Sequence, residues 1–490
     1  MPLCAGICRP FSRSTDKGEL KNACSLPIVL YFCNFITSNL LQMKQDTANA
    51  TYNTYADLIR EAELPAFPQE SAEGVRPLTM LSLFSGCGGM DLGFEGGFIC
   101  HQQSVGAHSP WIERPINDQW VLLKRNRFRT VFANDILKEA FVAWRNYMAR
   151  FHYAPSIYHQ ESIVDLVKAH QQGAKVFPEE VDIVTGGFPC QDFSVAGKRM
   201  GFKSDKAHDG KKRDEEIPTE ESRGKLYYWM KQVIDIIKPK IFIAENVKGL
   251  VSLGDVRHII QQDFAQAADD GYIVLPPQVL HAGNYGVPET RERVIFIGIR
   301  RNALTAEARA NLEQEIIPAA YNPYPAPTHH FTPETDATLL PPVTCRAIFE
   351  GLKEPEESLD LSQRRYSKAR YLGAHWQGQI EIHLDGLAPT IRSEHHGNIE
   401  YRRLSKEHGG LLEEELAKGW VERRLTPREC ALIQTFPPDY PFVAYKVDCK
   451  RFQLNPSGAY RVIGNAVPPL LAYNIARRIQ ELWACYFECK

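Results

Sequence analysis

Between residues 78 and 301 the chain repeats one pattern: a short apolar segment, a turn that is often rich in glycine, and an amphipathic segment. The apolar segments predict β-strands at 79–84, 130–133, 182–185, 241–244, 272–279 and 294–299, and amphipathic segments at 226–237 and 256–269 predict helices between them. Alternation of this kind is typical of an α/β fold with a doubly wound, mostly parallel sheet. Because ligands of such folds bind beyond the carboxyl ends of the strands, we expect the functional site at that edge.

The chain has a different texture on both sides of this region. Residues 1–75 contain four cysteines and then polar sequence, which we interpret as an N-terminal extension that is partly disordered. Met43 would serve equally well as a start, and our hypothesis is that residues 1–42 are an upstream extension whose synthesis in the cell is open. Residues 306–422 are proline-rich and irregular, which predicts a smaller second domain after an α/β domain at 76–305. Helical patterns return near the end, so we expect residues 423–490 to rejoin the first domain.

The composition excludes several classes of protein. The formal net charge is −2, so binding of nucleic acid must come from local basic patches and not from a global positive field. The 12 cysteines include no CxxC pair, which fits neither a disulfide framework nor a zinc cluster and favours a reducing, cytoplasmic location without a metal. The most apolar early stretch, about eleven residues at 26–36, is shorter than the roughly 20 needed to span a bilayer. We therefore expect no membrane partner.

A glycine-rich turn, Phe84-Ser85-Gly86-Cys87-Gly88-Gly89, follows the first predicted strand. Glycines at a strand-to-helix turn let the backbone approach a nucleotide-like ligand closely. Asp91 stands where the dinucleotide fingerprint has its third glycine, which argues against a bound pyrophosphate. The turn alone fits both a purely structural turn and a nucleoside-type cofactor site. Asp135 ends the second predicted strand, where a carboxylate can either accept hydrogen bonds from ribose hydroxyls or cap the following helix.

Further strand ends carry ionisable side chains. Cys190 follows the third predicted strand, and a single thiol there is either a nucleophile or a small buried apolar group. Glu245 ends the fourth strand, where a buried carboxyl needs a partner or a chemical task; capping the next helix is the alternative. Arg291 and Arg293 alternate before the last strand and therefore point to one face, as a fork for anionic groups requires.

In this order, the motifs resemble those of the DNA (cytosine-5) methyltransferases, in particular the prokaryotic enzymes of restriction-modification systems. The resemblance covers residues 79–301 and 423–480. Besides the motifs above it includes Glu245-Asn246-Val247, Arg424-Leu425-Thr426-Pro427-Arg428-Glu429 and Tyr460-Arg461-Val462-Ile463-Gly464-Asn465-Ala466-Val467-Pro468. It implies the fold of S-adenosylmethionine-dependent methyltransferases, with a catalytic and cofactor-binding domain at 76–305, a target-recognition domain at 306–422, and completion of the cofactor site by 423–490.

The resemblance also assigns residues to three groups. The implied catalytic residues are Cys190, Glu245, Arg291 and Arg293. The implied cofactor is S-adenosyl-L-methionine, and the residues implied to bind it are Phe84, Ser85, Gly86, Cys87, Gly88, Gly89, Asp135, Ile136, Ser162, Ile163, Phe188, Leu226, Asn465, Ala466 and Val467. The residues implied to contact double-stranded DNA are Gln191, Ser194, Lys198, Arg199, Thr390 and Arg392.

The implied reaction is transfer of a methyl group to C5 of a cytosine that is flipped out of a specific DNA duplex. Cys190 would attack C6, Glu245 would lie near N3, Arg291 would orient the base and Glu245, and Arg293 would hold the loop of the thiolate. Basic clusters in the recognition region, among them residues 364–370 and 402–403, would contact phosphates and bases, with solvated surface as the alternative. We further expect a monomer and, as a partner, a restriction endonuclease acting on the same site.

The chain departs from the family pattern at several positions. Glu289 replaces the glutamine usual before the arginine pair, Ile391 replaces a leucine of the recognition region, and Ser162 stands nearest to the expected aspartate that contacts adenine. An insertion lies at about 101–129, and a charged run at 203–221 lengthens the turn after the predicted nucleophile. We expect that run to be mobile when no DNA is present.

Other functions fit parts of the sequence. A cytosine-5 methyltransferase acting on tRNA would use the same pocket chemistry, but the long recognition region favours DNA. A DNA-binding module without chemistry would not need Cys190, Glu245 and the arginine pair together. An amino-directed methyltransferase is disfavoured because the chain has no Asp-Pro-Pro-Tyr or Asn-Pro-Pro-Tyr tetrapeptide.

Overall fold

The computed structural model describes residues 76–151, 153–189, 226–252, 256–330, 338–373, 379–393, 399–447 and 449–488. Some predictions therefore lie outside the described residues: the extension at 1–75, the charged run at 203–221, the predicted nucleophile Cys190, and the predicted DNA contacts Gln191, Ser194, Lys198 and Arg199. Residues 52–490 form one compact unit, which includes the recognition region expected at 306–422. The boundaries of that region stay predictions.

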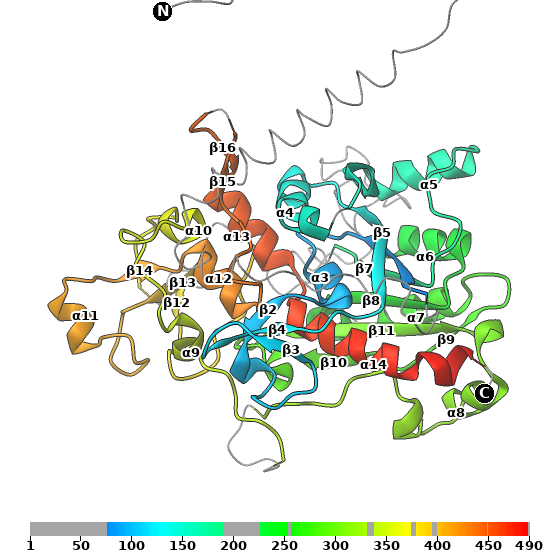
Figure 1. Cartoon of the computed structure of the whole chain (residues 1–490). Helices are drawn as coiled ribbons and strands as arrows, with labels where there is room; N and C mark the ends of the chain where they lie inside the picture. Colours follow the sequence, from blue (N-terminus) through cyan, green and yellow to red (C-terminus); the bar gives the residue numbers. More distant parts are fainter. Residues whose placement is uncertain are drawn as a thin grey trace, which may run out of the picture. The chain divides into compact units, whose positions relative to one another are not determined.

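The central sheet has the order β10-β11-β8-β7-β1-β5-β6, and β9 also pairs with β11 (Figure 1). Strands β8, β7, β1, β5 and β6 are parallel, whereas β11 runs antiparallel to β8, β9 and β10. The doubly wound α/β fold predicted from the sequence is therefore confirmed. The strands of this sheet are β1 (Leu78–Leu83), β5 (Phe128–Asn134), β6 (Tyr158–His159), β7 (Ile183–Gly187), β8 (Ile241–Val247), β9 (Tyr272–Val274), β10 (Gln278–His281) and β11 (Glu292–Arg300).

One strand prediction is wrong. The segment 272–279 was expected to be a single strand, but it is interrupted between β9 and β10. Pro276 and Pro277 lie at the interruption. Proline has no N–H to donate to a neighbouring strand, so two consecutive prolines break the pairing with β11.

The strands carry apolar side chains on both faces because helices cover both. Along β8, Phe242 and Ala244 belong to one buried cluster, and Ile241 and Ile243 belong to another. Successive side chains of a strand point to opposite faces, which explains this division. The helices of the first cluster are α5 (Ile163–Gln171), α6 (Leu226–Ile237) and α7 (Val256–Ala265), and those of the second include α3 (Gly89–Glu95), α4 (Lys138–Met148) and α14 (Pro469–Phe487). Helix α6 has the predicted bounds, and α7 ends before the predicted residue 269.

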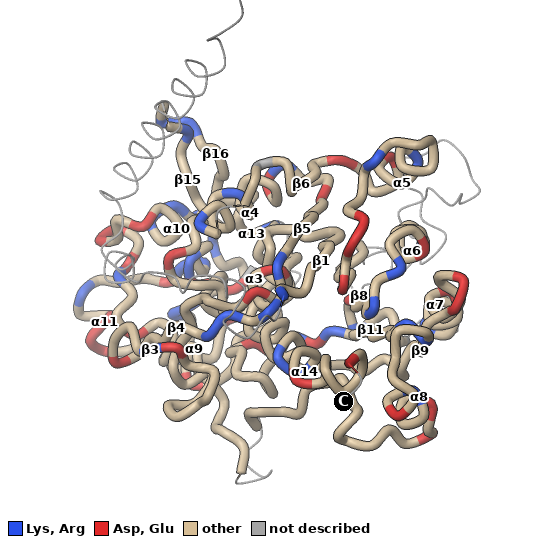
Figure 2. The backbone as a smooth tube through the Cα atoms, turned by 45° about the vertical axis from the view of Figure 1, so that its right-hand side comes forward, with Lys and Arg blue, Asp and Glu red and all other residues tan. Residues whose placement is uncertain are grey.

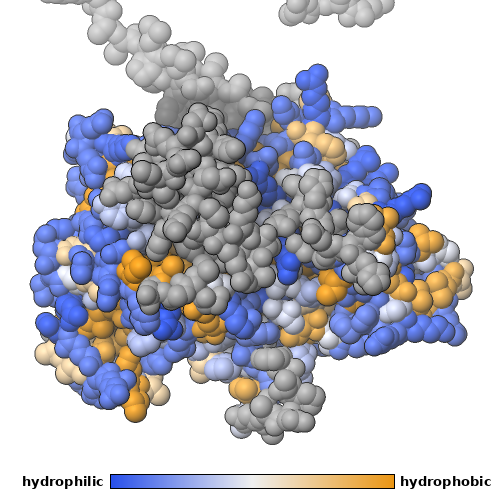
Figure 3. Space-filling model, turned by 180° about the vertical axis from the view of Figure 1, so that it is seen from behind, coloured by the Kyte–Doolittle hydropathy of each residue, from blue (hydrophilic) through white to orange (hydrophobic). Residues whose placement is uncertain are grey.

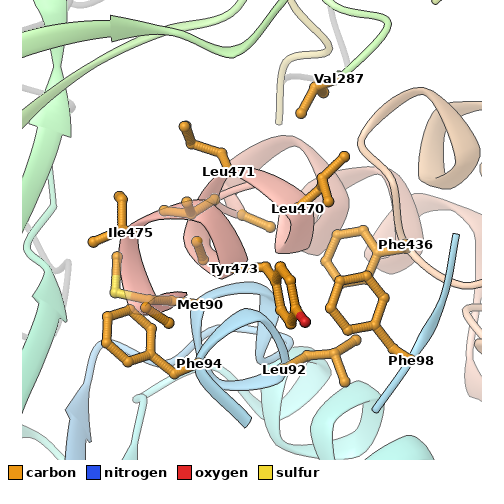
Figure 4. Packing of buried hydrophobic residues seen from close by; sticks show 14 of the residues in the cluster. Met90, Leu92, Phe94, Phe98, Val287, Phe436, Leu470, Leu471, Tyr473 and Ile475 are labelled. Carbon is orange, nitrogen blue, oxygen red and sulfur yellow. The ribbon is translucent and has the colours of Figure 1, made fainter. Parts of the chain in front are cut away.

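The C-terminal helix α14 packs on α3, so the last residues of the chain complete the core formed by its first helix. In Figure 4 the buried side chains between these helices include Met90, Leu92, Phe94, Leu470, Leu471, Tyr473 and Ile475. Gly93 permits the close approach, since a Cβ there would lie 2.4 Å from the Pro469 carbonyl oxygen and 2.5 Å from the Ala472 Cβ.

The remaining elements form smaller units around this core. The insertion expected near 101–129 forms a three-stranded antiparallel sheet with the order β2-β4-β3, and the recognition region contributes a sheet with the order β12-β13-β14. A hairpin of β15 and β16 precedes α13. The bounds are β2 (Ile99–His101), β3 (Ile112–Pro115), β4 (Trp120–Leu123), α8 (Ala306–Leu312), α9 (Cys345–Phe349), α10 (Leu361–Arg364), β12 (Gln379–Glu381), β13 (Ile399–Arg402), α11 (Glu413–Ala417), β14 (Arg423–Arg424), α12 (Pro427–Ile433), β15 (Ala444–Tyr445), β16 (Phe452–Leu454) and α13 (Pro456–Asn465).

Two arginines that we considered as DNA contacts are buried in an ion-pair network. Arg402 and Arg403 are 7% and 3% exposed. Arg403 pairs with Glu354 at 2.6 Å and with Glu415 at 2.8 Å, and Arg402 pairs with Glu429 at 2.8 Å. A buried guanidinium needs such carboxylates to offset its lost hydration. The prediction that residues 402–403 contact DNA is therefore wrong, and Arg402 instead fixes β13 to α12.

The exposed apolar side chains are dispersed. Figure 3 shows a face that is largely hydrophilic, with hydrophobic residues in separate groups. The most exposed large apolar residues that the structure describes, Ile316 and Val421, lie far apart in the chain and outside the central sheet. Single exposures of this kind are ordinary for a protein surface. None of the helices in the described part of the chain is long and apolar enough to cross a membrane.

We expect Gly93→Ala to lower the free energy of unfolding by about 1–3 kcal/mol, because the added methyl group would push α14 away from α3. Two of the nearest atoms, the Pro469 oxygen and the Tyr473 nitrogen, belong to the backbone and cannot move by a rotamer change. Urea unfolding followed by circular dichroism measures the effect. Gly386→Ala is the control, since its Cβ would meet only the His383 Cβ, at 3.3 Å. Its change should stay below about 0.5 kcal/mol, and equal losses in both variants would contradict the role given to Gly93.

Candidate functional site

The predicted motifs meet at the carboxyl edge of the parallel strands. Leu83, the last residue of β1, pairs with Asn134 of β5 and with Gly186 of β7. Gly187 pairs in turn with Glu245 of β8. The segments that follow these strands therefore leave the sheet side by side.

Hydrogen bonds fix the glycine turn to the end of β5. The Ser85 amide donates to the Asn134 carbonyl at 2.8 Å, and the Ser85 hydroxyl accepts from the Asn134 amide at 3.1 Å. Gly86 and Gly88 have φ angles of 56° and 81°, in the left-handed region that favours glycine, and Phe84 adopts a φ of 53° without being one. The turn therefore holds a backbone conformation that other side chains resist.

Asp135 joins the glycine turn to the segment before α4. Its Oδ2 accepts from the Gly86 amide at 3.1 Å, and its Oδ1 accepts from the Leu137 amide at 2.8 Å. Burial raises the pKa of Asp135, and these backbone donors oppose the increase. Of the two roles considered from the sequence, bonding to the local backbone is thus present. The contact with a ribose stays a prediction, as does the role of the neighbouring Ile136, which is 41% exposed.

The other residues expected to bind the cofactor on this side begin α5. Ser162 caps this helix by accepting from the Val164 amide at 3.3 Å, and Ile163 is buried. Asn134 ties the end of β5 to the same segment, because its Nδ2 donates to the carbonyls of His159 and Glu161, each at 2.9 Å. Ser162 therefore has a structural role in α5, and its contact with adenine stays a prediction.

The C-terminal block lies against the glycine turn. A Cβ at Gly89 would come within 2.2 Å of the Val467 carbonyl oxygen, and the Cys87 Sγ donates to the Val462 carbonyl at 3.4 Å. The segment 465–467, expected to complete the cofactor site, thus lies beside the turn expected to begin it. Burial strongly raises the pKa of Cys87, so that this thiol stays neutral and is not a second nucleophile.

Glu245 forms a buried ion pair with Arg293. Glu245 is 7% exposed, and its Oε1 lies 2.7 Å from the Arg293 Nε. Burial raises the pKa of Glu245, and the charges of Arg293 and Arg291 only partly oppose this increase. Gly187 makes room for the carboxyl, since a Cβ there would lie 2.7 Å from the Glu245 Oε2. A carboxyl in such surroundings can donate a proton near neutral pH.

Arg291 is completely buried and bonds to backbone rather than to Glu245. The contact with Glu245, which we expected from Arg291, is made by Arg293, and this assignment is corrected. Arg293 lies at the start of β11 directly beside β8, whereas Arg291 precedes the strand and reaches the C-terminal block. The guanidinium of Arg291 donates to three carbonyl oxygens, those of Ile391 at 3.0 Å, Gly464 at 2.9 Å and Ala466 at 2.6 Å.

Glu289 binds the same part of the recognition region. It is fully buried, its Oε1 accepts from the Ile391 amide at 2.6 Å, and the same oxygen lies 3.6 Å from the Arg291 Nη1. Burial raises the pKa of Glu289, and the charge of Arg291 opposes this. The two predicted DNA contacts in this segment differ: the Thr390 hydroxyl donates to a carbonyl of the neighbouring segment at 3.1 Å, and Arg392 is exposed.

The segment that leads to Cys190 is held by a residue to which we gave no role from the sequence. Asn246 donates from its Nδ2 to the Phe188 carbonyl at 3.2 Å, and Phe188 is buried. Its place in the Glu-Asn-Val motif was the signal for this role. Tyr158 was also missed; its hydroxyl donates to the Gly86 carbonyl at 3.2 Å, and nothing in the sequence around it indicates this contact. Leu226, expected near the cofactor, is buried at the start of α6.

Known proteins with similar sequences carry the same chemistry in their names. The pattern of the family described as C-5 cytosine-specific DNA methylase matches residues 78–481. The chain is 30% identical to the type II methyltransferase M.BsuRI of Bacillus subtilis, over 84% of this chain and 81% of that protein. It is also 30% identical to M.BspRI of Lysinibacillus sphaericus, over 84% of this chain and 83% of that protein. Because the family match spans most of its length, the chain belongs to the C-5 cytosine-specific DNA methylases and is a DNA (cytosine-5) methyltransferase.

Proposed function

We propose that this enzyme transfers a methyl group from S-adenosylmethionine to C5 of a flipped-out cytosine in a specific DNA duplex, through a covalent bond between Cys190 and C6 of the base. The observation that carries the proposal is the buried pair of Glu245 and Arg293, 2.7 Å apart, beside the strand end that leads to Cys190. A carboxyl next to the predicted nucleophile is what attack on a pyrimidine requires.

The proposed nucleophile answers a chemical difficulty of the substrate. C5 of cytosine is a poor nucleophile while the ring is aromatic. Attack of the Cys190 thiolate on C6 breaks the aromaticity and makes C5 enamine-like, so that C5 can accept a methyl group. Removal of the C5 proton by a base and elimination of the thiolate then restore the aromatic ring and free Cys190.

Glu245 is proposed to share its proton with N3 of the cytosine during this attack. Negative charge develops on the N3 side of the ring as the thiolate adds to C6, and a hydrogen bond from a protonated carboxyl stabilises it. Oε1 of Glu245 is engaged by Arg293, whereas Oε2 faces Gly187, three residues before Cys190. Arg293 therefore fixes the orientation of the carboxyl, and burial raises the pKa of Glu245 so that the proton is retained.

The residues around the glycine turn suit an adenosyl group. The left-handed glycines Gly86 and Gly88 leave the backbone of the turn without side chains, and Asp135 ends the neighbouring strand with a carboxyl that can accept from hydroxyls. Segment 465–467 closes the other side of the turn. S-adenosylmethionine, when bound, supplies a methyl group activated by a positively charged sulfur.

Extrusion of the target base costs a few kcal/mol, which contacts to the surrounding DNA must offset. We propose that Gln191, Ser194, Lys198 and Arg199 supply part of these contacts from the turn after Cys190. Thr390 and Arg392 would supply others from the recognition region. In support, the bonds of Glu289 and Arg291 to Ile391 hold that segment next to the arginine pair.

The similar proteins M.BsuRI and M.BspRI are named type II methyltransferases. By analogy we propose that this chain acts as a monomer in the cytoplasm and protects DNA from a partner endonuclease that acts on the same sequence.

We expect Cys190→Ala to lose at least about 10³-fold in the rate of tritium transfer from labelled S-adenosylmethionine to DNA, because no covalent intermediate can form. Bisulfite sequencing of DNA treated with the unchanged enzyme identifies the methylated cytosine. Cys449→Ser is the control, since Cys449 is exposed in the hairpin of β15 and β16, and it should retain the full rate. A Cys190→Ala variant with the full rate would contradict the mechanism, and labelling of tRNA instead of DNA would favour the alternative substrate.

We expect Glu245→Gln to lower kcat by about 10²- to 10⁴-fold, the usual range for loss of a general acid. The unchanged enzyme needs the protonated carboxyl, so its rate should fall as pH rises through the raised pKa of Glu245. Glutamine does not titrate, and this alkaline decline should be absent in the variant. Glu292→Gln is the control, because Glu292 adjoins Arg293 but pairs with Lys248. The role of Glu245 fails if its variant keeps the full rate and the same pH profile.

We expect Asp135→Ala to raise the Kd for S-adenosylmethionine by about 10- to 100-fold, as expected for loss of hydrogen bonds to a charged group worth roughly 1.5–3 kcal/mol. Isothermal titration calorimetry measures this Kd. Glu161→Ala, an exposed carboxylate at the next strand end, is the matched control and should leave it unchanged. Thermal unfolding of both variants detects any collapse of the turn, and an unaltered Kd in a folded Asp135→Ala variant would contradict the assignment.

A further inference from the structure

The hairpin of β15 and β16 carries cations that the reaction does not use. Lys446, Lys450 and Arg451 are exposed, and none of them belongs to an ion pair among the described residues. Figure 2 shows this group of basic residues at the end of the hairpin. The rings of Tyr445 and Phe452 stack with their centroids 4.9 Å apart, which holds the two short strands together. The hairpin therefore presents its cations on an ordered support.

A second group of cations follows α10. Arg364, Arg365 and Arg370 are exposed and are also outside the ion pairs of the described residues. Lys368 differs from them, because its ammonium lies 3.4 Å from Glu356. Three unpaired guanidinium groups within seven residues thus remain available to an anionic partner.

The two groups are brought together around the base of α13. The Val443 amide, just before β15, donates to the Ser362 hydroxyl of α10 at 3.0 Å. The Ser367 amide donates to the Tyr460 hydroxyl of α13 at 3.4 Å. Both groups therefore flank one helix, and we call their six cations the basic ridge: Arg364, Arg365, Arg370, Lys446, Lys450 and Arg451.

Helix α13 connects the basic ridge to the functional edge of the sheet. A helix of ten residues, as α13 is, spans about 15 Å. Its last residue, Asn465, belongs to the segment that lies on the glycine turn, and the charge of Arg461 near its middle acts on Asp135. The ridge thus lies within about one and a half helical turns of DNA from the edge where the target base would enter.

We propose that the basic ridge binds phosphates of duplex DNA outside the recognised sequence. The inference rests on the proposed function, and it adds a binding surface that neither the reaction nor base recognition requires. The formal net charge of the chain is −2, so DNA is not attracted by a global field, and local cations must supply the attraction. A duplex carries one phosphate charge for about every 1.7 Å of its axis, which suits a row of unpaired cations. Arg402 and Arg403, in contrast, are buried against carboxylates and cannot contribute.

The test compares two triple variants of the full-length chain, K446Q/K450Q/R451Q and R364Q/R365Q/R370Q. Fluorescence anisotropy measures the Kd for a labelled duplex between about 50 and 200 mM salt. Each phosphate contact adds about 0.9 to the slope of log affinity against log salt, so each triple variant should have a slope shallower by about 2.7. Over this range of salt the unchanged enzyme then loses about 40-fold more affinity than the variant. The kcat at saturating DNA should not change.

K175Q/R301Q/R309Q is the matched control, because it removes the same charge from exposed residues that pair with Glu179 and Glu313. Its slope should equal that of the unchanged enzyme. An unaltered slope in either ridge variant overturns the basic ridge as one surface, and an equal change in the control reduces it to an effect of net charge. If the unchanged enzyme neither binds nor methylates DNA, the proposed function itself fails; if it methylates DNA while the ridge variants keep its slope, only the ridge fails.

Discussion

The guanidinium of Arg291 holds together three parts of the chain that are far apart in sequence. It precedes β11 and donates to carbonyls of Ile391 in the recognition region and of Gly464 and Ala466 in the C-terminal block. Hydrogen bonds to a charged group contribute about 1.5–3 kcal/mol each, and a buried cation without partners costs several kcal/mol. The recognition region and the C-terminal block must therefore both return to this position for Arg291 to be buried at all.

The same strand start also fixes the carboxyl of Glu245. Arg291 and Arg293 are two residues apart and project to one face, but Arg293 already lies in the ladder with β8 and contacts Glu245 from there. A change of register between β11 and β8 would consequently disturb both contacts together. The orientation of the catalytic carboxyl and the return of two distant segments thus depend on one pairing of strands.

The sequence predicted the sheet well because its strands are apolar on both faces and end in polar motifs. It could not divide the work between Arg291 and Arg293, since both lie on the expected face and only the register with β8 shows which of them reaches Glu245. The interruption of the strand at 272–279 was readable from Pro276 and Pro277 and was overlooked. The inserted sheet of β2, β3 and β4 was recognised only as extra sequence, because its strands are short and pair with one another rather than with the central sheet.

Burial also decides what a departure from the family pattern means, and Glu289 is the clearest case. Its Oε1 accepts a hydrogen bond from the Ile391 amide at 2.6 Å, and the carbonyl oxygen of a glutamine could accept the same bond. The replacement therefore preserves the acceptor that holds the recognition segment and adds only a carboxyl that faces Arg291 at 3.6 Å. Because Arg291 already bonds to three carbonyl oxygens, the added carboxyl supplements a complete arrangement rather than replacing a missing partner. Glu289 thus changes the charge at the junction while the contacts that position Thr390 and Arg392 remain in place.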